Sequence, residues 1–437
     1  MKKILKYVAI YIFMICILIL MLTLTSMIPK EILKEKVSES ADILCEEGNR
    51  KLSIIPYKNI IMQFDNYSDA LMINTAYSID PETPLYSAMV ARKNYSPEIT
   101  ESVEPDSEKE LKSASKYQYH NEVGELRDLA NEDITESFEY ARYWHGYLVV
   151  LRPLLTFANV QTIRIILILI LVLLSGILLY QLNKKINWVV SMIFLFGLIS
   201  IEYFYIGISL QSSFCFLIMM ISSIIILMRG NKIKDISMIF FITGILTNFF
   251  DLLTVPCITY GIPLLIYFIT IAEEKNITIK ELIIIFLKTG IAWAIGYALT
   301  WFIKWLLVDL LYNRNLIAVA LKQVVYRSAG SQSFGYIKTL EFNTQYIEYF
   351  IYALIIGVAL YVEIEAVLKN KKPENIIGSI PYFLIGIIPF VWIFLIRDHS
   401  YKHSFFTYRN FILTMIGLPM GCYYLFNKKI KDKEQKD

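Results

Sequence analysis

The sequence predicts an all-α polytopic membrane protein with about ten transmembrane helices and a large outer loop domain. Two observations carry this prediction. Of the 437 residues, 56% are hydrophobic and only 19% are charged, which is more apolar than a typical soluble domain. The apolar residues also form long, almost uncharged blocks, which a bilayer accommodates and a small globular core does not.

Residues 1–27 predict the first transmembrane helix. The stretch 4–27 is apolar apart from Lys6 and is long enough to cross a bilayer with some tilt. A cleaved signal peptide is the competing interpretation. Against it, the apolar part is longer than the core of a typical signal peptide, and no clear small-residue cleavage site follows.

Residues 28–158 predict the outer loop domain. They contain 23 acidic and 14 basic residues, so no excess of positive charge holds them on the cytoplasmic side. Apolar residues at near-helical spacing in 29–44 predict an amphipathic helix on the outer membrane interface. The acidic stretch 96–133 is typical of a solvated, partly flexible lobe.

Residues 159–308 predict transmembrane helices 2–7. The apolar run that contains Asp251 and Pro256 is short for two full spans, which favours two compact helices or a re-entrant pair broken at these residues. The preceding run suits two helices that turn near Ser209. The predicted spans are 165–182, two helices within 186–228, two within 236–272, and 282–308.

The last third of the chain predicts a second outer loop at 309–345, transmembrane helices 8–10 within 346–427, and a cytoplasmic tail at 428–437. The three spans are 346–368, 375–396 and 410–427. The Ser- and Gly-rich piece 327–335 is typical of a mobile lid or substrate loop.

Lysine and arginine residues gather near alternate span ends, and this bias predicts the orientation. Cytoplasmic loops carry the excess of basic residues. The basic groups on that side include Lys2 and Lys3, Lys184 and Lys185, Lys232 and Lys234, and Lys371 and Lys372. We therefore expect a multi-pass protein of the plasma membrane with both termini in the cytoplasm.

Several classes of protein are disfavoured. The net charge of +3 is too small to indicate nucleic-acid binding. The chain contains no Gly-rich nucleotide loop, HExxH motif or nucleophile elbow. Its five cysteines include no CxxC pair, so a disulfide framework or a thiol-based metal or redox site is not expected.

Asp65 and Asp69 are the candidate catalytic acids. On a helix, residues four apart share one face. Two carboxylates there could hold a divalent cation, or could combine a protonated acid with an ionised base. The structural alternative is that Asp65 caps a helix while Asp69 is solvated in its first turn.

Arg142, Trp144 and His145 follow in an aromatic segment that leads back to the membrane. A guanidinium among flat rings is typical of phosphate or sugar recognition, because Arg binds phosphate oxygens and rings stack on sugars. An interfacial aromatic belt is the structural alternative. Asp251, at the outer end of a short span, is a further candidate, because an acid at membrane depth usually faces a polar cavity or a partner.

The loop between the last two spans contains Arg397, His399, His403 and Arg409. The two histidines could bind a metal or phosphate, and the two arginines could clamp a diphosphate. An ordinary polar loop is the alternative, but an outer loop this basic runs against the usual charge bias.

Lys322 and Arg327 lie in the other outer loop, at 309–345, and add positive charge to the same side. These cations could help to hold an anionic substrate. A solvated loop face explains both residues equally well.

This arrangement resembles the GT-C superfamily of integral membrane glycosyltransferases. The resemblance lies in the architecture: a cytoplasmic N-terminus, an acidic first outer loop, many spans and an outward-facing site. It implies a polyprenyl-phosphate sugar donor and a catalytic base in the first outer loop, sometimes with a metal ion. Asp65 or Asp69 would be that base, although the motif Asp65-Asn-Tyr-Ser-Asp69 differs from the adjacent acidic pairs often seen.

The predicted function is therefore the transfer of a sugar from a lipid-linked donor to a glycan or lipid acceptor on the outer face, for assembly of a cell-surface glycan. Such a reaction needs a base for the acceptor hydroxyl and cations for the departing phosphate. A transporter or flippase for a lipid-linked saccharide is the alternative, with Glu202 and Asp251 as pathway residues. A polysaccharide polymerase shares the substrate class.

Overall fold

The computed structural model describes residues 2–48, 51–52, 62–63, 65–94, 122–132, 136–274, 278–329, 335–373 and 375–427. Most of these residues are helical, and the strands among them form two small antiparallel sheets of two strands each. Most of the predicted acidic stretch, residues 330–334 of the predicted lid, and the predicted tail lie outside the described residues.

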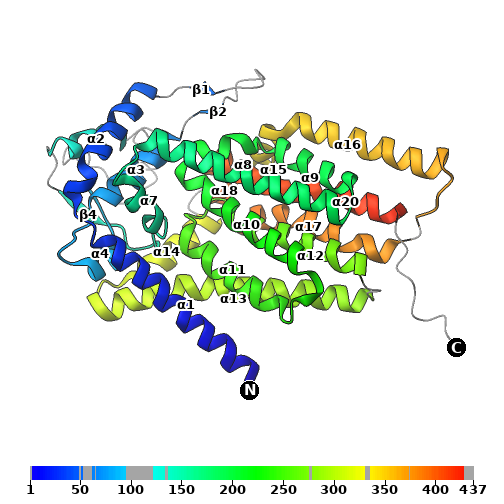
Figure 1. Ribbon diagram of the computed structural model, residues 1–437, viewed down its shortest axis with the longest axis horizontal. Coiled ribbons are helices and arrows are strands. Elements are labelled where there is room, and N and C mark those ends of the chain that lie inside the picture. Colours follow the sequence, from blue (N-terminus) through cyan, green and yellow to red (C-terminus); the bar gives the residue numbers. More distant parts are fainter. Residues whose placement is uncertain are drawn as a thin grey trace.

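The described residues among the first 155 form one long helix and a lobe, and Figure 1 shows the lobe at one end of the molecule. The strands β3 and β4 pair in antiparallel register, with Arg92 opposite Glu139 and Asn94 opposite Ser137. The elements are α1 (Lys2–Ser26), α2 (Lys30–Glu47), β1 (Lys51–Leu52), β2 (Met62–Gln63), α3 (Asn66–Tyr77), α4 (Pro84–Val90), β3 (Arg92–Asn94), α6 (Glu122–Ala130), β4 (Ser137–Glu139) and α7 (Leu148–Leu155).

The remaining helices form a bundle whose long members run away from the lobe (Figure 1). They are α8 (Val160–Lys185), α9 (Trp188–Ser200), η2 (Tyr203–Ile208), α10 (Leu210–Arg229), η3 (Gly230–Lys232), α11 (Ile236–Phe250), α12 (Ile258–Glu274), α13 (Ile279–Tyr312), α14 (Leu316–Ala329), α15 (Tyr336–Thr344), η4 (Gln345–Ile347), α16 (Glu348–Glu363), the π-turn η5 (Ile364–Leu368), α17 (Ile376–Leu395), α18 (Arg397–Lys402), α19 (Ser404–Thr407), η6 (Tyr408–Phe411) and α20 (Ile412–Asn427).

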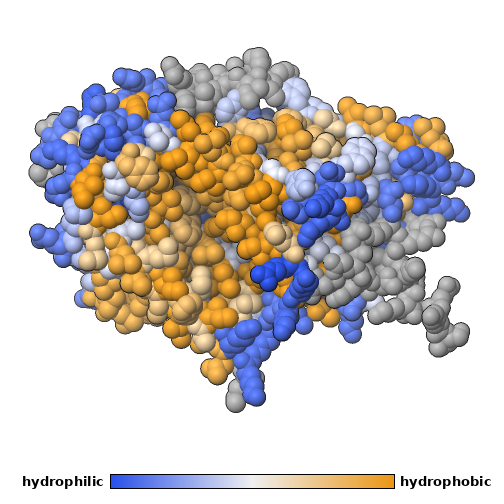
Figure 2. All heavy atoms as spheres, in the orientation of Figure 1, coloured by the Kyte–Doolittle hydropathy of each residue, from blue (hydrophilic) through white to orange (hydrophobic). Residues whose placement is uncertain are grey.

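The helical architecture agrees with the predicted fold class. Each of the ten predicted spans coincides in sequence with a helix. Within the described part of the chain, six units are long and apolar enough to cross a membrane, whereas α9, α11 and α12 have only 10–17 residues in their apolar parts. The number of ten spans is therefore not confirmed. The long helices present a broad apolar surface between hydrophilic regions (Figure 2).

The predicted helix breaks are present. The chain leaves α9 through Glu202, whose φ of 55° is left-handed, and α10 begins at Leu210. Farther along, α11 ends at Phe250, and Asp251 accepts hydrogen bonds from the Thr254 backbone N–H at 3.0 Å. The run 236–272 therefore folds as two compact helices.

Two features of the lobe differ from the sequence-based expectations. On α2, Leu33, Val37 and Leu44 are fully buried against protein whereas Ile32 is 53% exposed, so most of the apolar stripe marks a protein contact. At the end of the acidic stretch, α6 buries Glu122 and Glu125 instead of exposing them, because both pair with the buried Lys93.

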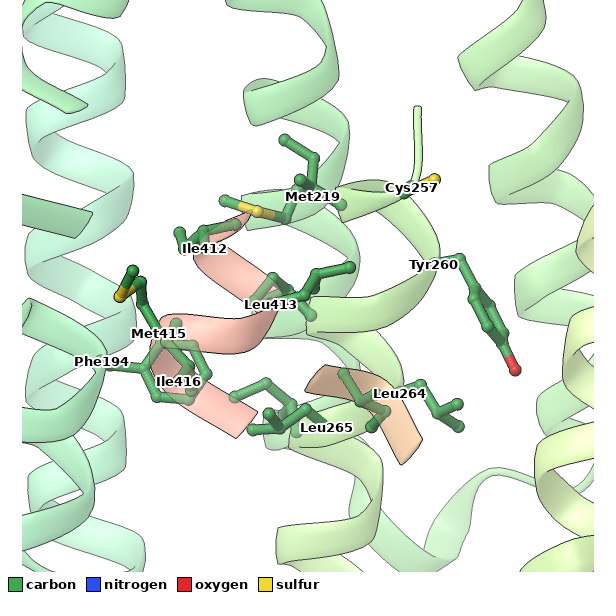
Figure 3. Packing of buried hydrophobic residues seen from close by; sticks show 14 of the residues in the cluster. Phe194, Met219, Cys257, Tyr260, Leu264, Leu265, Ile412, Leu413, Met415 and Ile416 are labelled. Atoms are coloured by element: carbon green, nitrogen blue, oxygen red, sulfur yellow. The ribbon is translucent and has the colours of Figure 1, made fainter. Parts of the chain in front are cut away.

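The bundle core is almost entirely aliphatic and aromatic. Figure 3 shows Met219 of α10, Leu264 of α12 and Leu413 of α20 packed together. Elsewhere α11 and α13 approach closely where Gly244 and Gly296 face the backbone of the other helix, so any side chain at either position would clash.

The basic span ends lie together at one end of the bundle. Lys185 at the end of α8 donates to the Leu227 carbonyl near the end of α10 at 3.0 Å. Lys371 donates to Asn427 at the end of α20 at 2.9 Å. The alternation of helix direction assumed for the orientation therefore holds for these helices.

Arg164 of α8 fixes the lobe to the bundle. Its guanidinium, only 4% exposed, contacts Asp69 at 2.8 Å, Glu47 at 2.8 Å and the Asn66 amide oxygen at 3.0 Å. Asp69 in turn accepts from the Leu210 backbone N–H, the first of α10, at 2.8 Å. One arginine therefore joins α2, α3 and α8, and through Asp69 also α10.

We predict that Arg164→Met lowers the free energy of unfolding by about 3–5 kcal/mol, because it leaves buried carboxylates unpaired. The measurement is thermal or denaturant unfolding in detergent micelles. The matched control is Lys34→Met, which removes an exposed pair with Glu132 and should leave the stability almost unchanged. Equal losses in the two variants would contradict the anchoring role.

Candidate functional site

The two candidate acids have different environments. Asp69 is fully buried, and both of its oxygens are used by Arg164 and the Leu210 N–H. Burial raises the pKa of Asp69 to about 7, although the positive charge of Arg164 acts in the opposite direction. Since its side chain is fully buried and paired with Arg164, Asp69 is suited to holding the lobe and not to meeting a substrate.

Asp65 is partly exposed and caps α3. One oxygen accepts from the Ser68 backbone N–H at 3.2 Å, and the other accepts from the Gln211 amide of α10 at 2.8 Å. Burial raises the pKa of Asp65, while the nearby charge of Arg409 lowers it. The capping role considered from the sequence is therefore real, and it leaves a partly exposed carboxylate between the lobe and α10.

Arg409, from the last loop, lies near enough to Asp65 for its positive charge to favour the ionised carboxylate. Its side chain is 5% exposed, and its Nε has no hydrogen-bond partner among the described residues. The guanidinium lies 5.2 Å from the ring centre of Tyr408, and its charge acts on both Asp65 and Glu202. We call Asp65, Glu202, Gln211, Tyr408 and Arg409 the Asp65–Arg409 cluster.

A second cluster surrounds Asp251. The Thr254 hydroxyl donates to Asp251 at 2.5 Å and lies 3.8 Å from the Cys215 sulfur. Burial raises the pKa of Asp251 to about 6. Since Cys215 and Gln211 are four residues apart on α10, they lie one turn apart on the same face. The helix α10 therefore contributes Gln211 to the Asp65–Arg409 cluster and Cys215 to the cluster around Asp251.

His399 links Asp251's loop to Arg327. The Arg327 guanidinium can only donate, so Nδ1 of His399 accepts at 3.2 Å, and Nε2 carries the proton and donates to the Leu253 carbonyl at 2.8 Å. Burial lowers the pKa of His399 well below its ordinary value. His399 is therefore neutral and orients Arg327, which lies 5.9 Å from the Tyr143 ring centre.

His403 is also neutral. Its ring lies 4.6 Å from that of His399 and stacks on Phe406 at 5.2 Å. Burial lowers its pKa to about 3. Neither histidine therefore supplies a cation for phosphate.

Among the described residues, no group of three or more His, Cys, Asp or Glu side chains could hold a metal ion, so the donor set does not fit the divalent metal considered from the sequence.

The aromatic segment of the lobe is used mainly for packing. Trp144 is 2% exposed and donates to the Thr300 carbonyl at 2.7 Å. His145 is fixed between Tyr147 and the Tyr140 carbonyl, and burial lowers its pKa to about 3. Arg142 is half-buried, with its guanidinium 5.7 Å from the Tyr140 ring centre.

The other predicted cations are more dispersed. Lys322 is exposed on α14. It lies five residues before Arg327, about 140° around the helix, so the two side chains do not share a face. Arg397 lies 3.9 Å from Asp398, its own neighbour. Of the six basic residues named from the two outer loops, Arg409 belongs to the Asp65–Arg409 cluster, and Arg327 is joined through His399 to the loop that contains Asp251.

Sequence reasoning missed Gln211 and Asn248. Gln211 follows the predicted turn at Ser209 but carries no motif, and only its contact with Asp65 identifies it. Asn248 is 3% exposed, and both of its amide atoms lack a hydrogen-bond partner within the described residues. It precedes Asp251 by three residues, near the end of α11.

Comparison with family models, with curated proteins and with solved structures finds no match for this chain.

We predict that Arg409→Gln raises the pKa of Asp65 further, because an opposite charge nearby favours the ionised carboxylate. A carboxyl ¹³C NMR titration measures this, with the Asp65 signal identified by its loss in Asp65→Asn. The control Arg314→Gln removes an exposed guanidinium that pairs with Glu139 and should leave the titration unchanged. An unchanged titration midpoint for Asp65 in Arg409→Gln would show that the charge of Arg409 does not influence Asp65.

Proposed function

We propose that the protein is a membrane glycosyltransferase that moves a sugar from a polyprenyl-phosphate-linked donor to a glycan or lipid acceptor at the outer surface of the membrane. One observation carries the proposal. Asp65, from the first loop, and Arg409, from the last, both lie near the start of α10, where Asp65 accepts a hydrogen bond from Gln211 and the charge of Arg409 favours the ionised form of Asp65. A base and a phosphate-binding cation are the two groups that this reaction requires.

In the proposed reaction the acceptor hydroxyl oxygen attacks the anomeric carbon of the donor. The new carbon–oxygen bond forms as the bond from that carbon to the phosphate oxygen breaks. Asp65 takes the hydroxyl proton, and the lipid phosphate leaves with the electron pair of the broken bond. A raised pKa makes Asp65 a stronger base than an ordinary aspartate while it is ionised.

Arg409 would bind the departing phosphate. Its buried, incompletely hydrogen-bonded guanidinium is suited to a phosphate oxygen, because charge-assisted hydrogen bonds are strongest away from water. Arg327, oriented by His399, is a second cation on the same side. The neutral histidines and the absence of a ligand set in the described residues lead us to route no step through a metal ion.

The proposed topology follows from charge. The basic ends of α8 and α16 would face the cytoplasm, as the positive-inside bias requires. Both termini would then be cytoplasmic, and the lobe would face outward from the plasma membrane. A lipid-linked donor would reach the Asp65–Arg409 cluster from the bilayer, and nucleic acid has no part in the proposal.

The transporter or flippase alternative needs acids along a path through the membrane. Glu202 lies after the end of α9, and Asp251 lies after the end of α11. Both acids are therefore at helix ends and not midway along a span. This placement favours a site at the surface over a pathway across the bilayer.

Asp65→Asn should reduce turnover at least about 100-fold, because general base catalysis typically contributes 10²–10⁴. Donor binding should change little, since Asn keeps the shape and the capping oxygen. The assay measures lipid phosphate released from a panel of polyprenyl-phosphate sugars, with donor affinity measured separately.

Asp42→Asn is the control, because Asp42 is an exposed acid on α2 in the same lobe. A flippase would keep most of its flux in Asp65→Asn. If Asp65→Asn transfers sugar at the parental rate, Asp65 is not the base.

A further inference from the structure

The bundle contains an apolar pocket of about 350 Å³ at a distance from both clusters. It lies between α9, α16 and α20, and its lining includes Met192, Phe196, Leu354 and Pro419. The volume is in the range of small-molecule sites, roughly 300–1,000 Å³. The only polar side-chain atoms in the lining, apart from the Cys422 sulfur, are the hydroxyls of Tyr361 and Tyr423.

The pocket exists because α16 packs loosely on the bundle. Leu354 is the only buried residue of α16, and Ile355, Ile356 and Leu360 are more than half exposed. Figure 1 shows α16 along one edge of the bundle. In a bilayer, such a gap beside a lipid-facing helix is accessible to hydrocarbon chains.

Polar groups close the pocket at the end that carries the basic residues. Asn187 donates to the Tyr423 hydroxyl at 3.0 Å, and Asn427 donates to the Tyr361 hydroxyl. Lys371 donates to the same Asn427 at 2.9 Å. The tyrosines of the pocket are thus directly connected to a cationic rim.

This rim has a positive balance. Among the described residues at the ends of α8 and α16, five lysines outnumber two glutamates; these are Lys184, Lys185, Lys369, Lys371 and Lys372 against Glu363 and Glu365. Glu365 is within 2.7 Å of Lys369 and 2.5 Å of Lys371. The remaining positive charge complements an anionic head group at the membrane surface.

We propose that an anionic phospholipid of the adjoining leaflet binds here, with one acyl chain in the pocket and its phosphate at the lysine rim. The chain fills the gap that α16 leaves, so the lipid connects α16 to α9 and α20. The site is separate from the Asp65–Arg409 cluster and does not depend on the proposed transfer reaction.

Gly357 provides the test. It lines the pocket, and a Cβ at this position would meet nothing within 4 Å. Gly357→Leu therefore fills the pocket without a clash at its Cβ. Gly176 of α8 is also in open space but lies outside the pocket lining, so Gly176→Leu is the matched control.

Each protein is delipidated, reconstituted with equal amounts of phosphatidylglycerol and phosphatidylcholine, and examined for retained lipid by native mass spectrometry. The parent and Gly176→Leu should retain phosphatidylglycerol. Gly357→Leu should retain at least about ten-fold less, because excluding about two methylene groups removes that much affinity. Lys371→Gln should weaken the preference for phosphatidylglycerol, whereas Lys30→Gln, in the lobe, should not.

Equal retention by Gly357→Leu and Gly176→Leu would overturn the proposal. Equal retention of the two phospholipids by the parent would also overturn it. If added polyprenyl phosphate displaced the phospholipid from the parent but not from Gly357→Leu, the pocket would belong to the carrier lipid and the proposal would be wrong.

Discussion

The buried ionic contacts of Arg164 are the constraint on which the site depends. A buried guanidinium is tolerated only when acceptors surround it, and here they come from α2 and α3. Arg152, also fully buried, donates to the carbonyls of Thr25 and Ile28 at the end of α1 and to Ala76 near the end of α3. Two arginines thus fix a lobe that has little regular sheet structure.

The position of Asp65 follows from this attachment. Asp69 is one turn farther along α3 and binds the first N–H of α10, so the start of α3 faces the start of α10. Gln211 then reaches Asp65. The last loop adds Arg409 from the opposite end of the chain. In this arrangement Asp69 holds the structure, and the partly exposed Asp65 is the candidate for chemistry.

Much of the fold could be predicted from the sequence, because long apolar runs and breakers such as Pro256 specify helices locally. The roles of the two acids could not be predicted in this way. Their spacing places Asp65 and Asp69 on one face of a helix, but it does not reveal that Arg164 pairs with Asp69. The histidines of the last loop look cationic in sequence, but burial makes them neutral. Likewise, the apolar stripe of α2 does not reveal whether protein or lipid covers it.

A double-mutant cycle tests most directly whether the two ends of the chain form one site. The free energy of unfolding in detergent would be measured for the parent, Asp65→Asn, Arg409→Gln and the double variant. Groups that interact should give a coupling of about 0.5–3 kcal/mol, whereas independent groups should be additive within about 0.3–0.5 kcal/mol. The account predicts clear coupling, and additive losses would contradict it.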